Sequence, residues 1–345
     1  MTVPDLALTQ RRQRVLRAVI EEHIVTGQPI WPQTLVRSGS FGPSASTLRY
    51  ELAWLEAVGL LGHPYTSAGR VPTDLGYRLY AGELLAQRIA IEPLDVDLTE
   101  ATREVDDALL ATTEALSQVT RLLAIASAPS VALANIRHVE ILALQPQVVM
   151  TLVITGSGAV VKRVFAFDGP VDPGLAGWAR VYLNEMLTVG SISERAVRSR
   201  MESVDLDGQE RAFLDAIAPV FHDLFEAGAD RLFIGGTSRL MTELHAQNQH
   251  ELGELAAVLE QRAVMLDQLR AALRGDDVTV RIGDEIEAPA MRPVAMVTAG
   301  YGLPRRVLGA VSVIGPVRMD YAQAIIAVRG AAAALSAYVE DVYED

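Results

Sequence analysis

The chain has 345 residues, of which 50% are hydrophobic, and it carries a formal net charge of −13 and no cysteine. This length predicts about two to three domains with enough apolar residues for packed cores. The absence of cysteine excludes disulfides, thiolate nucleophiles and cysteine-based zinc sites. No continuous apolar run of about eighteen residues and no signal-peptide pattern occurs, so we expect a cytoplasmic protein that does not span a membrane.

The first forty residues predict two helices. Thr9 can cap a helix whose apolar residues repeat at helical spacing over positions 15 to 24, and Gly27-Gln28-Pro29 would end it. A short second helix fits Pro32 to Arg37, with the proline in the first turn, where a missing N–H is tolerated.

A third helix follows, with small hydroxyl residues and an arginine near its start. Apolar residues at positions 48, 52, 55 and 58 have the spacing of a helix with one buried face, so we expect Leu48, Leu52 and Leu55 in the core. Its polar side suits the DNA major groove. Tyr50 could instead pack under the neighbouring segment. The candidate DNA contacts of this helix are Ser44, Ser46, Thr47, Arg49 and Tyr50.

The segment from His63 to Asp74 predicts a hairpin loop. It is rich in Gly, Pro, Ser and Thr, is bracketed by apolar residues, and would carry Arg70 at its tip. Thr66, Ser67 and Arg70 are its candidate DNA contacts, with a merely solvated charge as the alternative for the arginine. A helix with an adjacent hairpin predicts a winged-helix domain, which we assign to residues 1–90.

The rest of the chain predicts a sheet that is interrupted by helices. Residues 91–95 are the expected linker, and a long helix is expected from about 99 to 126. Between the two groups of strands lie residues 170–274, mainly helical in pattern, which must fold on their own side of the sheet. The expected strands are 138–144, 148–155 and 159–167, then 278–282, 295–298 and 307–313, before a terminal helix over 321–338.

Several motifs along the chain belong together. They are Leu8-Thr9-Gln10-Arg11, Thr47-Leu48-Arg49, Thr66-Ser67-Ala68-Gly69-Arg70-Val71-Pro72-Thr73-Asp74 with Gly76-Tyr77-Arg78, Ile282-Gly283-Asp284-Glu285, and Gly315-Pro316-Val317-Arg318-Met319-Asp320-Tyr321. In this order they resemble the heat-inducible transcription repressor HrcA family of bacteria over nearly the whole chain. The chain departs from that family at Tyr50, where the family usually has an asparagine, and at Trp31-Pro32. An asparagine can pair bidentately with adenine and a tyrosine cannot, so the operator bases read there can differ.

The resemblance implies an α+β protein of three domains. These are the winged helix of residues 1–90, a GAF-like α/β domain made of 96–169 and 275–345, and a mainly helical dimerisation domain inserted at 170–274. The family's function would make the protein a homodimer that represses chaperone operons of the groE and dnaK type. It would bind an inverted-repeat operator (CIRCE) in double-stranded DNA, and the GroE chaperonin would keep it active. The alternatives are a winged-helix regulator controlled by a small molecule in the GAF-like domain, and a pure interaction module.

The charge of the chain is divided unevenly. Residues 1–90 contain nine arginines and seven acidic residues, a net of +2, which leaves −15 for the remainder. A weakly basic domain attracts phosphates only modestly. A single DNA-binding domain should therefore bind weakly, and two acting together are expected.

Other candidate sites favour structural roles. His245 and His250 have no further ligand at a suitable spacing, so no metal site is expected. Gly156 and Gly158 fit a hairpin turn, and Gly235-Gly236-Thr237-Ser238 fits a turn better than an anion site. Asp320 is expected to cap the last helix. No Ser/His/Asp order, paired carboxylates or nucleophile elbow occurs, so we expect no enzyme and no cofactor.

Overall fold

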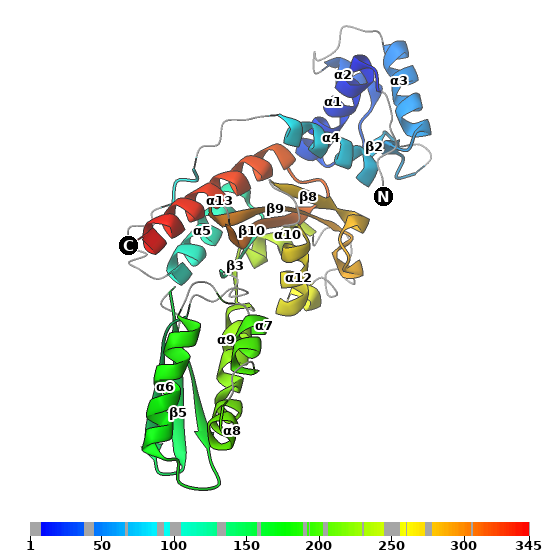
Figure 1. The fold of residues 1–345 in the computed structure, drawn as a ribbon. Helices are drawn as coiled ribbons and strands as arrows, with labels where there is room; N and C mark the ends of the chain where they lie inside the picture. The colour runs from blue at the N-terminus through cyan, green and yellow to red at the C-terminus, as the bar shows by residue number, and fades with distance from the viewer. Residues whose placement is uncertain are drawn as a thin grey trace. The chain divides into compact units, whose positions relative to one another are not determined.

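The protein is a mixed α/β chain with two compact units (Figure 1). Unit 1 comprises Met1–Ala126 and Leu232–Tyr338, and unit 2 comprises Ser127–Arg231 and Val339–Asp345. We call them the split unit and the insert unit. The computed structural model describes residues 8–37, 45–65, 68–87, 93–96, 105–129, 136–156, 160–188, 192, 194–202, 206–229, 231–244, 256–259, 261–272, 278–304 and 306–344.

The split unit begins with a helical region, residues 8–87, which we call the head. Its first helix starts at the predicted cap, because the Thr9 side chain accepts a hydrogen bond from the Arg12 N–H at 3.4 Å. It ends at Gly27, whose φ of 63° is a left-handed conformation that favours glycine. The elements of the head are α1 (Gln10–Thr26), α2 (Pro32–Arg37), α3 (Ala45–Ala57), β1 (Leu61–Gly62), β2 (Val71–Pro72) and α4 (Asp74–Ala86).

The head has its own apolar core and a polar tie between two helices. The Arg12 guanidinium lies 3.7 Å from the centre of the Trp54 ring, and its Nε donates to Glu51 Oε2 at 3.0 Å. This contact joins α1 to α3. The fully or nearly fully buried side chains include Val15, Leu16, Val19, Ile20, Leu35, Leu48, Leu52 and Leu55, as the helical spacing predicted.

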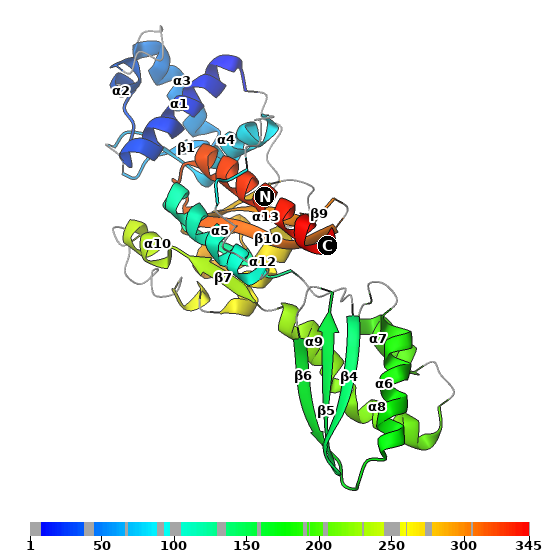
Figure 2. The same cartoon turned by 90° about the vertical axis from the view of Figure 1, so that its left-hand side faces the viewer.

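The rest of the split unit is a five-stranded sheet with helices on both faces. The strand order is β7-β3-β10-β9-β8, and the pairs β3–β10, β10–β9 and β9–β8 are antiparallel. Helices α10 and α12 pack on the face that carries Leu123, Ile125 and Met296. Helices α5 and α13 lie side by side on the other face (Figures 1 and 2), and the Gln323 amide of α13 donates to the Val119 carbonyl oxygen of α5 at 3.0 Å. The bounds are α5 (Val105–Thr120), β3 (Leu123–Ser127), β7 (Leu232–Gly235), α10 (Thr237–Leu244), α12 (Arg262–Ala272), β8 (Thr279–Ile282), β9 (Val294–Leu303), β10 (Arg306–Pro316) and α13 (Tyr321–Glu344).

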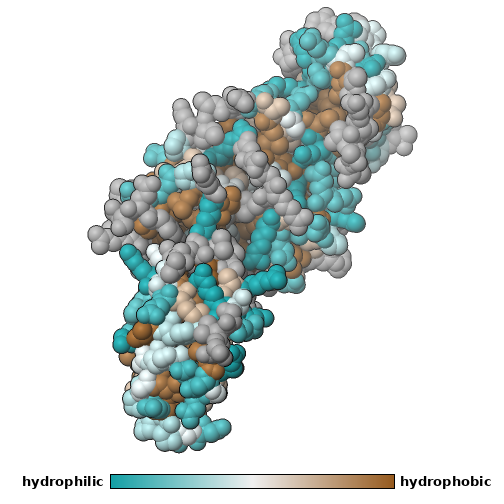
Figure 3. Space-filling model, in the orientation of Figure 1, coloured by the Kyte–Doolittle hydropathy of each residue, from teal (hydrophilic) through white to brown (hydrophobic). Residues whose placement is uncertain are grey.

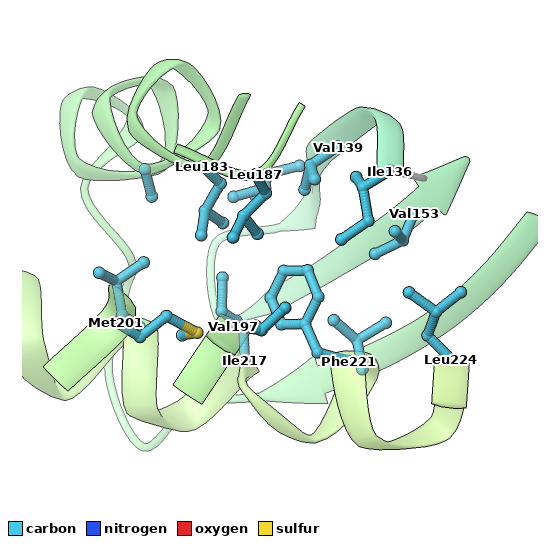
Figure 4. Close-up of a cluster of buried hydrophobic side chains, with 14 of the residues drawn as sticks. Ile136, Val139, Val153, Leu183, Leu187, Val197, Met201, Ile217, Phe221 and Leu224 are labelled. Atoms are coloured by element: carbon cyan, nitrogen blue, oxygen red, sulfur yellow. The ribbon is translucent and has the colours of Figure 1, made fainter. Parts of the chain in front are cut away.

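The insert unit has a separate sheet and core. Strands β4, β5 and β6 form an antiparallel sheet, with the helices of the unit beside and behind it in Figure 2. Side chains such as Val139, Val153, Leu183 and Phe221 form the core between sheet and helices (Figure 4). The bounds are β4 (Ile136–Gln145), β5 (Val148–Thr155), β6 (Val160–Ala166), α6 (Pro173–Leu187), α7 (Glu194–Glu202), α8 (Gly208–Ile217) and α9 (Pro219–Ala229).

The structure has a compact unit between two parts of the split unit, and its bounds differ from the expected 170–274. The strands of residues 136–166 pair only with one another among the described strands, so they belong to the insert and not to the split sheet. Residues 232–272 return to the split unit as β7, α10 and α12. The inserted segment therefore runs from 127 to 231, between the neighbouring strands β3 and β7. Its two ends are joined by a hydrogen bond from the Ala128 N–H to the Arg231 carbonyl oxygen at 2.9 Å.

The helix predicted from 99 to 126 is also shorter than expected. Helix α5 ends at Thr120, and Arg121 has a φ of 58°, a left-handed conformation that interrupts the helix. The following residues, 123–127, form β3 and pair with β10. Pairing with a strand almost two hundred residues away outweighs the helical pattern of this segment.

Helix α13 is apolar because it is a core helix. Its segment Tyr321–Val342 is long and apolar enough to cross a membrane by length and composition, but half of it is buried within the fold. Ile325, Val328 and Leu335 are among its fully or nearly fully buried side chains. At its start, Asp320 Oδ1 accepts from the Gln323 N–H at 3.0 Å, which is the predicted cap.

Candidate nucleic-acid interface

Helix α3 separates its apolar side from its hydrogen-bonding side. Leu48, Leu52 and Leu55 are fully buried, whereas Ser46 and Arg49 are exposed and Thr47 is half-buried. Tyr50 is 67% exposed, so it does not pack under the hairpin, which was the alternative for this residue. Polar groups of α3 are thus presented to solvent from a rigid helix.

Arg49 and Tyr50 are available to bind another molecule. Within the described part of the chain, neither side chain has a hydrogen bond, ion pair or ring contact. A guanidinium can donate two parallel hydrogen bonds to guanine or to a phosphate, and a phenol can donate and accept. Of the other predicted contacts, Ser44, Thr66 and Ser67 lie outside the described residues.

The two acidic residues of α3 are already paired with basic residues. Glu51 is buried and accepts from Arg12, with Arg11 at 4.0 Å from its other oxygen. Glu56 Oε2 lies 3.4 Å from the Arg70 guanidinium, and its Oε1 lies 3.1 Å from His63 Nε2. Arg49 is therefore the charge that α3 presents without a partner. Because Glu51 and Glu56 are paired with basic side chains, they repel an approaching polyanion less than two free carboxylates would.

The structure places Arg70 at the base of the hairpin, so its prediction as the tip residue was wrong. The backbone of Arg70 exchanges two hydrogen bonds with Ile30, both of 2.8 Å. The Arg70 side chain is only 21% exposed and faces Glu56. The preceding Gly69 is pressed against Ile30, since a Cβ there would lie 2.7 Å from the Ile30 carbonyl oxygen. The backbone pairing with Ile30 and the ion pair with Glu56 therefore hold Arg70 against the head.

The hairpin has an exposed aromatic residue that was not among the predicted DNA contacts. Tyr65 is 64% exposed and precedes the two residues of the loop that lie outside the description. The signal was an aromatic side chain directly after Pro64, in a segment otherwise made of small and polar residues. The hairpin thus presents an exposed aromatic side chain, as α3 does with Tyr50.

These features of the head and of the two units define a class of protein. The chain is a multidomain α/β protein whose N-terminal helical head exposes a guanidinium, hydroxyls and a phenol from one helix next to a hairpin. Such a surface offers hydrogen bonds of the kind that bases and phosphates accept. It contains no constellation of nucleophile and base among the described residues.

Comparison with known proteins identifies the family. The family model described as HrcA protein C terminal domain matches residues 106–325. The heat-inducible transcription repressor HrcA of Parafrankia sp. (strain EAN1pec) is 34% identical over 338 residues, covering 94% of this chain and 97% of the relative. The namesake protein of Nocardia farcinica (strain IFM 10152) is 33% identical and covers 96% of each chain. The chain therefore belongs to the heat-inducible transcription repressor HrcA family.

One solved structure shares the fold over nearly the whole length. It is a crystal structure of a protein described as hypothetical, with a TM-score of 0.64 and 20% sequence identity. The alignment covers 97% of this chain and 99% of that one. The fold is thus not peculiar to this sequence.

Proposed function

We propose that this protein is a DNA-binding transcription repressor whose head is a winged helix. Helix α3 would lie in the major groove, where Ser46, Thr47, Arg49 and Tyr50 would reach base edges and phosphates. The hairpin between β1 and β2 would be the wing, with Tyr65 and the predicted contacts Thr66 and Ser67 near the backbone. The observation that carries this proposal is the exposed, unpartnered Arg49 on the polar side of α3. Family membership supports it, because the named relatives are transcription repressors.

Arg70 would have a structural role, whereas Arg49 would contact DNA. Since Arg70 is held by Ile30 and Glu56, we infer that it fixes the wing against the end of α3. The five-stranded sheet with helices on both faces would be the GAF-like body. The strands of this sheet come from both sides of the insert in the sequence, as expected for a GAF-like domain that is interrupted by an insertion.

The insert unit supports a dimer, in which a second copy would cover one face of its sheet. Alternate residues of β5 from Val149 to Thr155 are buried towards the helices, and those between them are not. On the other face, Leu142 pairs with Met150 and Met150 pairs with Val164, which gives a row of three apolar residues across the strands. Leu142 is 41% exposed and Val164 is 55% exposed.

We call this surface the open sheet face. Figure 3 shows hydrophobic residues exposed at several places on the side of the insert unit that it draws. An apolar face of this kind gains free energy when a like face covers it. A symmetric dimer presents the same face from both copies and carries two heads, as an inverted repeat requires.

The expected operator is the inverted repeat read by the resembled family, upstream of chaperone genes of the groE and dnaK type. The GroE chaperonin would keep the repressor active. Support comes from topology: β3 pairs with β10 across the whole insert, and such long-range pairing slows folding and exposes aggregation-prone intermediates. The test is refolding from denaturant with and without chaperonin, followed by measurement of operator-binding dimer. Full recovery without chaperonin at growth temperature would contradict this part of the proposal.

The test of DNA reading uses two matched arginine variants. Arg49→Ala should reduce discrimination between the operator and scrambled DNA by about 1 to 3 kcal/mol, because a bidentate arginine–base pair is lost. Arg17→Ala is the control: it removes the same charge from α1, where Arg17 pairs with Glu21 and lies near Glu83 of α4. Fluorescence anisotropy on labelled operator measures both. Equal affinities of wild type and Arg49→Ala for every DNA would remove Arg49 from the interface.

A further inference from the structure

Motifs that are far apart in the sequence meet at one junction in the split unit, between the head and the sheet. The rings of Tyr77 in α4 and Tyr321 in α13 have centroids 5.7 Å apart, and both residues are almost fully buried. The Tyr77 hydroxyl lies 2.7 Å from His23 Nδ1, and the Tyr321 hydroxyl donates to the Val317 carbonyl oxygen at 2.6 Å. Burial raises the pKa of both phenols, so they remain neutral hydrogen-bonding groups. This pair is the apolar centre of the junction.

Arg78 joins the head to the edge of the sheet. Its guanidinium donates to the Val280 carbonyl oxygen of β8 and lies 3.6 Å from Glu285 Oε2. The same carboxylate oxygen accepts from the Ile282 N–H at 3.0 Å. Since one residue of α4 engages both β8 and the turn after it, rotation of the head about the tyrosine pair would break these contacts.

A third contact lies at the end of α1. A Cβ added to Gly27 would lie 2.8 Å from a guanidinium nitrogen of Arg318. The cation therefore lies against the C-terminus of α1, where the free carbonyl groups carry partial negative charge. On the α4 side, a Cβ added to Gly283 would clash with the carboxylate of Asp74. Residues of the segments 68–78, 282–285 and 315–321 thus meet at one junction, beside a cavity that His23, Asp74, Tyr77, Val317 and Arg318 help to line.

We propose that Arg78, with Tyr77, is a positioning residue that locks the head in one orientation on the split sheet. In each copy of the chain, the split sheet would then determine the direction of α3. This inference rests on the proposed function, because its consequence appears in operator binding. In a dimer, locked heads accept one spacing of half-sites. Heads that were only tethered would accept many spacings and bind each less tightly, since the effective concentration of the second head falls.

The DNA test uses two variants of the full-length chain, Arg78→Ala and Glu285→Ala. Each is titrated with the operator, with the operator carrying five extra base pairs between half-sites, and with a single half-site. Five base pairs turn the second half-site to about the opposite side of the duplex. Wild type should strongly prefer the native spacing, and both variants should lose at least about tenfold of that preference. Affinity for a single half-site should stay unchanged.

The two variants separate the lock from damage to the head. Glu285 lies outside the head, so a change in Glu285→Ala cannot come from a misfolded α3. Arg17→Ala is the control and should keep the wild-type preference. A wild-type spacing preference in both Arg78→Ala and Glu285→Ala would overturn the inference.

A second readout needs no DNA and distinguishes failure of the lock from failure of the proposed function. The chain has no cysteine, so Gln13→Cys and Glu287→Cys, both at exposed positions, can carry spin labels alone. Excess unlabelled protein suppresses distances between labels on different copies. Pulsed electron paramagnetic resonance should then give one narrow distribution of the distance between the labels at positions 13 and 287. Arg78→Ala should broaden it. Equal widths would overturn the lock even if operator binding is as proposed, whereas a narrow wild-type distribution without operator binding would leave the lock and refute the function.

Discussion

The head and the insert unit each leave one surface uncovered, and these surfaces differ in chemistry. The uncovered side of α3 carries hydroxyls, a guanidinium and a phenol, whereas the open sheet face carries a row of leucine, methionine and valine beside the row of Glu140, Leu152 and Lys162. An apolar face is stabilised by another apolar face. An unpaired guanidinium is stabilised by an anionic or carbonyl acceptor. In the proposed function the first surface binds DNA and the second binds another copy of the chain.

The largest effect should come from a charge on the open sheet face. Val164→Asp would bury a carboxylate in the proposed dimer interface, so we expect monomers in analytical ultracentrifugation. Operator affinity should fall about 100-fold or more because the second head no longer binds intramolecularly. Val181→Asp is the control, since Val181 is 51% exposed on α6. A dimeric Val164→Asp protein with full operator affinity would show that the dimer forms elsewhere.

A cavity in the core of the head should weaken DNA binding and leave the dimer intact. Leu52→Ala should destabilise the head by about 2 to 5 kcal/mol, because it empties a fully buried position of α3. Operator binding should weaken on warming while the dimer persists, since the insert unit has a separate core. Thermal unfolding followed by circular dichroism, with ultracentrifugation at the same temperatures, checks this. Loss of the dimer together with the head would contradict the separation of the two surfaces.

Arg70 should behave differently from Arg49 if it fixes the hairpin. Arg70→Ala removes a partly exposed ion pair with Glu56, so we expect a loss of stability of about 1 kcal/mol or less. Discrimination between operator and scrambled DNA should stay near the wild-type value. Urea unfolding and anisotropy titrations measure the two effects. A loss of discrimination as large as that of Arg49→Ala would make Arg70 a base contact.

The smallest effect concerns the pH dependence of the head–sheet junction. Desolvation, with Arg318 nearby, lowers the pKa of His23 in the folded state. The unfolded chain, with a histidine pKa of about 6.5, then binds more protons, so stability falls as the pH drops through that value. His23→Gln should reduce this loss between about pH 7.5 and 5.5 in urea unfolding. An equal pH dependence of wild type and His23→Gln would exclude His23 as its source.

Local signals carried the prediction of the head. Thr9, Gly27 and Pro32 mark helix ends through their own backbone preferences, and the observed ends of α1 and α2 agree with them. The buried side of α3 follows from spacing alone. Arg70 was misplaced because the pairing of its backbone with Ile30 is a contact across some forty residues, which no local pattern encodes.

Sheet membership could not be read from the sequence. The strands 138–144 and 148–155 were predicted and agree with β4 and β5, yet alternation of side chains does not say which sheet a strand joins. Leu123 to Ser127 looked helical because its residues have no strong strand preference, and pairing with β10 decides its structure. The junction around Tyr77 and Tyr321 was visible only as separate motifs, since their meeting depends on the whole fold.

The most direct measurement of the central claim is a binding titration of the full-length protein against three DNAs of equal length. These carry the inverted repeat, one half-site and a scrambled sequence, at one fixed salt concentration because phosphate contacts are salt-dependent. We expect the tightest binding to the inverted repeat, weaker binding to one half-site by a factor of about 100 or more, and the weakest binding to the scrambled DNA. Equal affinity for all three DNAs would contradict it.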